Sequence, residues 1–260
     1  MADDTTRTNA TTLLRLHQDP TLLTVVNVWD VISARSVAAV EGTRALATAS
    51  HSIAASLGYE DGENIPVDEM LAAVERIVRA TDLPVTADLE GGYGDAAGTV
   101  RRAIGLGVVG ANIEDQMKPL AEAAAQVEAI MKVASEEGVD FVLNARTDAF
   151  VHGKDREPAD VLADAVERGK AFLDAGAPVV FVPGKLDEGQ IETLVEAFGP
   201  QRLTTIGIPG TPALSWQEAH GVARVSYGPL SQNVALTALQ ELVEDVHRDG
   251  GVPSSVRILN

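Results

Sequence analysis

Short apolar segments alternate with longer amphipathic segments along the chain. Apolar runs bounded by Gly, Pro and polar residues predict buried strands, and they cover residues 22–30, 44–51, 84–90, 110–115, 141–148, 178–184, 203–208 and 223–228. Apolar residues at helical spacing follow each run, over residues 31–41, 66–81, 97–107, 119–138, 158–176, 188–199, 215–221 and 231–250. The pattern therefore predicts eight strand–helix pairs.

Strands that alternate with helices form parallel sheets. Eight such pairs within 260 residues predict a closed (β/α)8 barrel, the TIM-barrel α/β fold. The alternative is a doubly wound open sheet, which usually carries a Gly-rich turn after its first strand. Residues 27–35 contain no glycine, which favours the barrel. We treat residues 1–260 as one domain, in which residues 1–20 form a loose N-terminal arm or a helix across the barrel bottom.

Composition narrows the classes of function. The net charge of −18 argues against nucleic acid or an anionic membrane as a partner. The chain has no cysteine, which excludes disulfides, zinc–thiolate sites and cysteine nucleophiles. The polar N-terminus does not resemble a signal peptide, and no stretch approaches the roughly 18 apolar residues of a membrane span. We expect a cytoplasmic protein.

The active site of such a barrel lies at the carboxyl ends of its strands. A polar residue is therefore a candidate for function where it ends a predicted strand. In chain order these residues are Trp29 and Asp30; Thr48, Ala49, Ser50 and His51; Asp88 and Glu90; Glu114 and Asp115; Arg146 and Asp148; and Pro183, Thr204 and Ser226.

Three carboxylates in this set predict a metal site. Strand alternation places Asp88 and Glu90 on one face, and Glu114 ends the next strand at matching depth. Carboxylates this close repel one another unless a cation or protons compensate. An oxygen-only ligand set suits Mg²⁺, with Mn²⁺ as the alternative. Each acid taken alone could instead cap a helix or form an ion pair.

Arg146 is the one cation that ends a predicted strand. A guanidinium beside a metal suits a substrate with a carboxylate or phosphoryl group, which it can bind in bidentate fashion. The structural alternative is an ion pair with Asp148 or Glu114. We expect His51 to donate a hydrogen bond at the rim, and we assign no role to His17, His152, His220 or His247.

Five segments carry a family resemblance. "TASHSIAASLGYEDGE", "ADLEGGYG", "GANIEDQ", "NARTDAF" and "GVARVSYGP" resemble the isocitrate lyase / phosphoenolpyruvate mutase superfamily over residues 22–246. The resemblance implies a (β/α)8 barrel, Mg²⁺ and a small 2-oxo acid substrate whose enolate is stabilised on the metal while a C–C or P–C bond is broken or made.

The resemblance also implies roles for individual residues. Asp88 would bind the metal directly, with Glu90 and Glu114 holding its waters. Asp61 would complete the polar ring near the metal, and Arg146 would bind the substrate carboxylate. We assign Arg146, Asp61 and Glu114 as the catalytic residues. Substrate-binding roles fall to the segment Thr48, Ala49 and Ser50, and we add the strand ends Trp29, Asp30 and Thr204. Members commonly form dimers of dimers that exchange a C-terminal helix. This chain ends soon after its eighth predicted helix, which argues against exchange, but we still expect a homo-oligomer, a dimer or a tetramer.

One departure bears on the reaction. Asp115 is followed by "QMKPLAEAAAQ", so the lid loop of the family is cut to a few residues in which Lys118 is the only cation. Without the lid, the sequence does not identify the general acid. The candidates are Asp61, Asp115, His51 and Lys118. Three hypotheses remain. The first is a Mg²⁺-dependent lyase or decarboxylase acting on a 2-oxo acid, or on a 2-hydroxy acid that releases one. The second is a P–C mutase or hydrolase, and the third is a 2-oxo-acid-binding protein without turnover.

Overall fold

The structure, a computed structural model, describes residues 2–259. Within that range nine parallel strands form one sheet in the order β1-β9-β8-β7-β6-β5-β4-β3-β2. The strands are β1 (Leu23–Val25), β2 (Asn27–Val28), β3 (Leu46–Thr48), β4 (Val85–Asp88), β5 (Gly110–Glu114), β6 (Val142–Arg146), β7 (Val179–Phe181), β8 (Leu203–Ile206) and β9 (Val222–Ser226). The predicted parallel barrel is confirmed in a nearly closed form.

The first predicted strand is divided, which accounts for nine strands instead of eight. Its first part, β1, pairs with β9, and its second part, β2, pairs with β3. Val26 separates the two parts and is partly exposed. Because both parts come from one run of chain, the two edges of the sheet lie next to each other here and the barrel is nearly closed.

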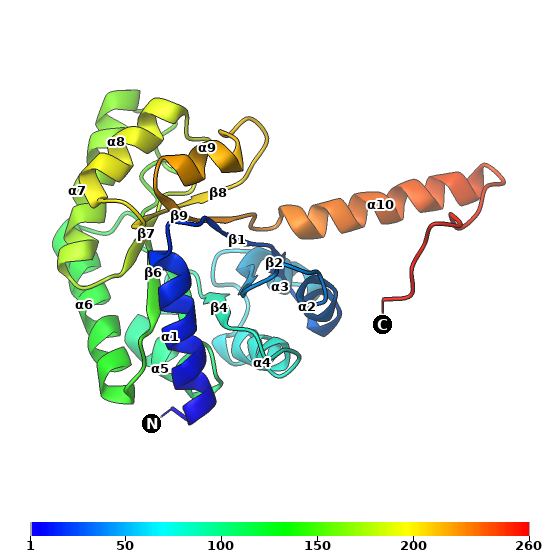
Figure 1. Cartoon of the computed structure of the whole chain (residues 1–260), viewed down its shortest axis with the longest axis horizontal. Helices are drawn as coiled ribbons and strands as arrows, with labels where there is room; N and C mark the ends of the chain where they lie inside the picture. The colour runs from blue at the N-terminus through cyan, green and yellow to red at the C-terminus, as the bar shows by residue number, and fades with distance from the viewer. Residues whose placement is uncertain (1, 260) are drawn as a thin grey trace.

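Helices connect the strands and surround the barrel (Figure 1). They are α1 (Asp4–Gln18), α2 (Val31–Ala38), α3 (Ser50–Ser56), α4 (Val67–Val78), α5 (Ala96–Gly105), α6 (Leu120–Glu137), α7 (Pro158–Asp174), α8 (Glu188–Phe198), α9 (Leu214–Ala219) and α10 (Leu230–His247). Helix α3 was not predicted: its first residues Ser50 and His51 fall in the predicted strand 44–51, and the rest falls between that strand and the next predicted helix. Its buried residues Ile53 and Ala54 pack into the core beside β3.

Helix α1 packs against the bottom of the barrel, at the amino ends of the strands. Asn9 donates a hydrogen bond to the carbonyl of Asp82, just before β4, and Thr11 donates one to Asp140, just before β6. Leu13 approaches Gly110 so closely that a Cβ on that glycine would lie 3.0 Å from Leu13 and 2.7 Å from a backbone oxygen of β6. Only glycine permits this approach of helix and strand.

Helix α10 does not pack along the barrel as the other helices do. Figure 1 shows that it extends away from the barrel with the C-terminal segment beyond it. Its first turn is anchored, because Ser231 donates to the Asn27 carbonyl and Gln232 donates to the Ser52 carbonyl and the Ser56 hydroxyl. Beyond that turn its large apolar side chains are exposed, namely Val234, Leu236, Leu239, Val243 and Val246.

The α1 residue His17 is fully buried and gives the fold a pH dependence. Burial, together with the positive charge of Arg224, lowers the pKa of His17 to about 3. The unfolded chain takes up a proton here below about pH 6.5, whereas the folded chain does so only near pH 3. Between those values the unfolded state binds more protons, so we expect stability to fall by up to about 1.4 kcal/mol per pH unit as the pH drops.

Chemical unfolding between pH 7 and pH 4 measures this effect. The variant His17→Gln should show a shallower fall than the natural sequence, because the titrating group is gone. His247→Gln, in exposed α10, is the matched control and should leave the slope unchanged. Identical slopes for all three proteins would assign the acid sensitivity to other groups.

Candidate active site

The predicted acids gather at the carboxyl end of β4 and β5, but a turn rather than strand alternation directs Glu90. Strand β4 ends at Asp88, and Glu90 has a left-handed backbone with φ of 52°. The prediction that Glu114 lies level with Asp88 is also wrong. The partner of Asp88 on β5 is Asn112, while the Glu114 N–H donates to the Glu90 carbonyl. Asp88 and Asn112 therefore form one level, with Glu90 and Glu114 above it.

Asp88 is held by the strand and helix that precede it in the barrel. The Ser50 hydroxyl and N–H donate to Oδ2 of Asp88, at 2.8 and 3.2 Å. The Asp88 N–H donates to the Thr48 hydroxyl at 3.0 Å. The other carboxylate oxygen, Oδ1, is buried and has no hydrogen-bond partner within the described part of the chain. Asp88 thus presents one fixed and one free oxygen.

Glu90 joins the loop between α3 and α4 to the loop that follows β4. The Tyr93 hydroxyl donates to Glu90 Oε1 at 2.8 Å, and the Glu63 N–H donates to Oε2. Glu63 in turn accepts a hydrogen bond from the Tyr93 N–H at 2.6 Å. Burial raises the pKa of Glu90 against these hydrogen bonds, and it also raises the pKa of Tyr93 with help from the Glu90 charge.

Arg146 lies between two acids, so both of its predicted structural pairs are present. Its Nη1 is 3.0 Å from Glu114 Oε2, and its Nε donates to Asp148 Oδ1 at 2.7 Å. Burial works to lower the pKa of Arg146, but the carboxylates of Asp148 and Glu114 outweigh it and raise the pKa. Burial raises the pKa of Glu114 to about 7, against the Arg146 charge and with support from Asp148 and Asp88.

The donor set at this mouth fits a hard divalent cation. Among residues 2–259, no three His, Asp or Glu side chains converge closely enough to hold a metal as they stand, because Glu90 and Glu114 are turned to protein donors. Asp88 nevertheless keeps a buried free oxygen, and the carboxylates of Asp88 and Glu90 both raise the pKa of Glu114. An oxygen-only group with excess negative charge suits Mg²⁺ or Mn²⁺.

The short loop after β5 makes several contacts with neighbouring parts of the chain. The carboxylate of Asp115 accepts hydrogen bonds from the N–H groups of Met117 and Asp148 and forms an ion pair with Arg168 at 3.1 Å. Lys118 donates to Gln126 at 3.2 Å. Asp115 and Lys118 therefore both make contacts within their own chain, and the general acid stays open among the four candidates.

The other predicted residues occupy distinct places. Asp30 caps α2 in a reciprocal capping box with Ser33, and Trp29 lies beside it in the wall of a groove next to α2. The Ala49 N–H donates to the Val28 carbonyl. Asp61 lies in the loop between α3 and α4, where it is exposed, and its charge helps to raise the pKa of Glu90.

The strand-end criterion missed several residues at or below the mouth, namely Asn112, Asn144, Arg224, Tyr93 and Glu63. Thr204 was predicted to end its strand, but β8 continues to Ile206 and Thr204 is buried inside the barrel, 1% exposed. Inside the barrel, Thr204 donates to Asn144 Oδ1 at 2.6 Å, and Asn144 donates to Asn112 Oδ1 at 2.7 Å. Arg224 of β9 is also buried inside, 1% exposed. A charged residue within the apolar run 222–226 was the available signal for Arg224. Tyr93 and Glu63 had no such signal, because their contacts join distant loops.

Comparison with known proteins places these features in context. Residues 13–247 match the family model of phosphoenolpyruvate phosphomutase. The chain is 31% identical to 2-methylisocitrate lyase of Escherichia coli (strain K12), over 78% of this chain and 72% of that enzyme. It is 28% identical to oxaloacetate decarboxylase of Paraburkholderia xenovorans (strain LB400), over 85% of this chain and 77% of that enzyme.

A solved structure gives a similar result. Oxaloacetate acetylhydrolase in complex with its product oxalate matches with a TM-score of 0.84 and 25% identity, covering 96% of this chain and 91% of that one. Separately, within residues 2–259 no helix is both long and apolar enough to span a bilayer.

Proposed function

Since the chain belongs to the phosphoenolpyruvate mutase / isocitrate lyase superfamily, we propose that it is a cytoplasmic Mg²⁺-dependent enzyme that cleaves a C–C bond in a small 2-oxo acid, or in a 2-hydroxy acid that releases one. The observation that carries the proposal is the free buried oxygen of Asp88 at the mouth, with Glu90, Glu114 and Arg146 around it. Among simple substrates, oxaloacetate is the first candidate. Its decarboxylation depends more on polarisation of the substrate by a metal than on proton delivery from a precisely placed general acid.

Asp88 and the acids around it would have different roles in metal binding. Asp88 would hold the cation directly, and Glu90 and Glu114 would hold its waters. When bound, Mg²⁺ would act as a Lewis acid that stabilises negative charge on the substrate as the C–C bond breaks. Ser50 fixes the second oxygen of Asp88, so the free oxygen keeps its orientation.

Arg146 would bind the substrate carboxylate. Its guanidinium is held from two sides by Glu114 and Asp148, so its position is set before substrate arrives. Such preorganisation favours binding of a planar carboxylate in bidentate fashion. The β5–α6 connection, residues 115–119, is too short to reach across the mouth, which favours a substrate whose reaction tolerates water.

Turnover of oxaloacetate tests the proposal. We expect its loss in Mg²⁺ at neutral pH to exceed the background of free metal, and Glu114→Gln to return the rate to that background. Arg146→Lys should lower kcat/KM by roughly 10- to 100-fold through loss of a bidentate charged contact. Arg101→Lys, in an exposed ion pair with Glu136 and Glu137 on the outer helices, is the matched control.

Two other results would redirect the assignment. If oxaloacetate and a panel of 2-hydroxy acids are inert while oxalate binds in the presence of Mg²⁺, the protein is a 2-oxo-acid-binding protein without turnover. Turnover of a phosphono acid alone would assign the P–C reaction instead. That second candidate has weaker support, because Lys118, the one cation of the shortened loop, is bound to Gln126.

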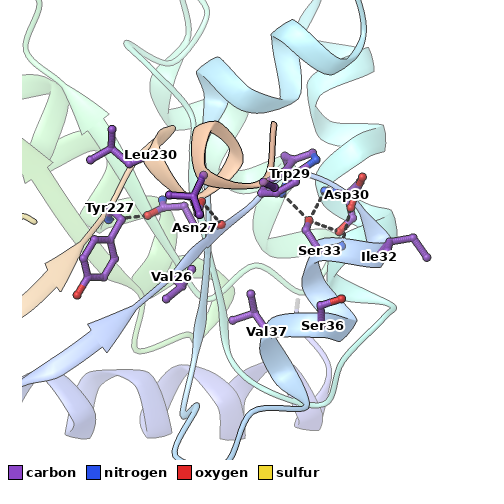
Figure 2. Close-up of a pocket in the computed structure, with 13 residues that line it drawn as sticks. Val26, Asn27, Trp29, Asp30, Ile32, Ser33, Ser36, Val37, Tyr227 and Leu230 are labelled. Carbon is purple, nitrogen blue, oxygen red and sulfur yellow. Dashed lines mark hydrogen bonds between the residues drawn. The ribbon is translucent and has the colours of Figure 1, made fainter. Parts of the chain in front are cut away.

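We also propose that the protein is a homo-oligomer built on exchange of α10, against our expectation from the chain length. An apolar groove of about 550 Å³ lies between α2 and the start of α10 (Figure 2). Its wall includes Val26, Trp29, Ile32 and Val37. In a (β/α)8 barrel a helix packs against the outside of each strand. Helix α10 instead extends away from the barrel and does not cover this groove.

The apolar stripe of α10 suits the groove of a second copy. Leu236, Leu239, Val243 and Val246 recur at intervals of three and four residues and are 45–55% exposed. That spacing gives one continuous apolar face on a helix. Because each copy carries both the stripe and the groove, two copies can each complete the other's barrel.

A further inference from the structure

A buried ion pair joins helix α7 to the loops at the mouth. Arg168 of α7 is 9% exposed, and its Nη1 donates to Asp115 Oδ2 at 3.1 Å and to the Lys118 carbonyl at 3.0 Å. Its Nε donates to Asp164 at 2.9 Å. The side chain of Asp115 is 1% exposed. Arg168 therefore contacts, from the outer layer of helices, the connection between β5 and α6.

Asp115 also contacts the segment that follows β6. Its N–H donates to the Arg146 carbonyl at 3.0 Å, and its Oδ1 accepts a hydrogen bond from the Asp148 N–H at 3.1 Å. The Asp148 carboxylate in turn accepts a hydrogen bond from Arg146 Nε at 2.7 Å. A continuous series of contacts thus runs from Arg168 through Asp115 and Asp148 to the guanidinium of Arg146.

The turn that follows Asp115 has a strained backbone. Gln116 and Met117 are consecutive residues in the left-handed region, with φ of 49° and 51°, although neither is glycine. The Met117 N–H donates to Asp115 Oδ1 at 3.0 Å, and Arg168 donates to the Lys118 carbonyl. Such a backbone persists only where the surrounding contacts determine it, and it is concentrated at functional sites. The pair of Arg168 and Asp115 supplies those contacts.

Stability alone is a weak reason for this ion pair. Burial of two charges costs desolvation that can exceed their attraction, and an apolar pair of similar volume often stabilises a fold as well or better. An apolar pair could not make directed hydrogen bonds to the Lys118 carbonyl and to the N–H groups of Met117 and Asp148. The contacts of the pair therefore favour a role in the geometry of the mouth.

We propose that Arg168 is a positioning residue for Arg146. It holds Asp115, which holds the backbone of Asp148, and Asp148 fixes the guanidinium of Arg146 where it would bind the substrate carboxylate. The proposal rests on the proposed function in taking Arg146 as the carboxylate-binding residue. Without Arg168, Asp115 is a buried carboxylate that has lost its ion-pair partner. We expect it to shift, so that Arg146 keeps only its contact with Glu114.

The Nε–H of Arg146 reports the position of this side chain without any substrate. In NMR spectra of the natural sequence, this proton should exchange slowly with solvent because Asp148 accepts its hydrogen bond. Its signal is identified by its loss in Arg146→Lys. Arg168→Met should accelerate the exchange at least about tenfold, and Arg168→Lys, which keeps a charged donor, should recover most of the protection. Arg156→Met is the matched control, because Arg156 is exposed and pairs with Asp164.

Kinetics with oxaloacetate and Mg²⁺ separate positioning from a general loss of structure. Arg168→Met should raise KM at least about fivefold while kcat changes less than about twofold, because carboxylate binding acts alike on bound substrate and transition state. In an Arg146→Lys background the same change should raise KM by a much smaller factor, since the guanidinium that Arg168 positions is gone.

Unchanged exchange of the Arg146 Nε–H in Arg168→Met, or equal factors in KM in both backgrounds, would overturn the proposal and leave Arg168 a structural role. If Arg168→Met does not fold, Arg168→Gln, which keeps an uncharged N–H donor, is measured in its place. If the natural sequence turns over no oxaloacetate, the proposed function fails, while exchange of the Arg146 Nε–H still decides whether Arg168 positions Arg146.

Discussion

Replacing Asp88 by alanine is expected to weaken Mg²⁺ binding by at least about 100-fold and to remove measurable turnover, with a small effect on folding. Substitution of a residue that only orients a metal ligand already lowers metal affinity by about 10- to 100-fold. Loss of a direct ligand should therefore exceed that range. The fold should tolerate the change because Asp88 ends β4 at the mouth and is not part of the apolar core.

Calorimetric titration with Mg²⁺, alongside thermal unfolding in EDTA, measures both parts of this expectation. Asp82→Ala is the matched control, since Asp82 is an exposed acid three residues before the amino end of the same strand. Unchanged Mg²⁺ binding in Asp88→Ala would place the metal elsewhere and remove the basis of the proposed reaction.

Introducing two charges into the apolar stripe of α10, by Leu239→Glu with Val243→Glu, is expected to convert the oligomer to monomers at micromolar concentration. Both side chains are about half exposed in the single chain, so the change should have little effect on the fold of the barrel. In an interface the same positions would bury two unpaired carboxylates. We expect the affinity between subunits to fall by at least about 100-fold.

Light scattering coupled to size-exclusion chromatography gives the mass directly. Gln240→Glu adds a charge to an exposed polar position of the same helix and should leave the mass unchanged. A natural sequence that is monomeric at all concentrations would end the exchange proposal. Loss of mass in the Gln240→Glu control would indicate that net charge, rather than the apolar stripe, governs association.

Site residues were predictable from the sequence where their place at the end of a strand is enough to bring them to the mouth. Asp88, Glu114 and Arg146 each end a strand of a parallel barrel, and all strands of such a barrel present their carboxyl ends at one mouth. Glu90 was predicted for a wrong local reason, because the strand stops at Asp88 and the turn at φ of 52° directs the side chain. Asp115 illustrates the limit, since its partner Arg168 lies 53 residues away.

The sequence by itself determined the parallel barrel and the acidic mouth. The spacing of apolar residues and the positions of turn residues are local properties that can be read in a window of roughly 10 to 20 residues. The order of the strands then follows from the short connections between them. Tertiary structure alone decided three further features. They are the break of the first strand at Val26, the direction in which α10 leaves the barrel, and the burial of the Arg224 side chain inside the barrel. Each depends on contacts between residues far apart in the chain, whose geometry is fixed only when the barrel closes.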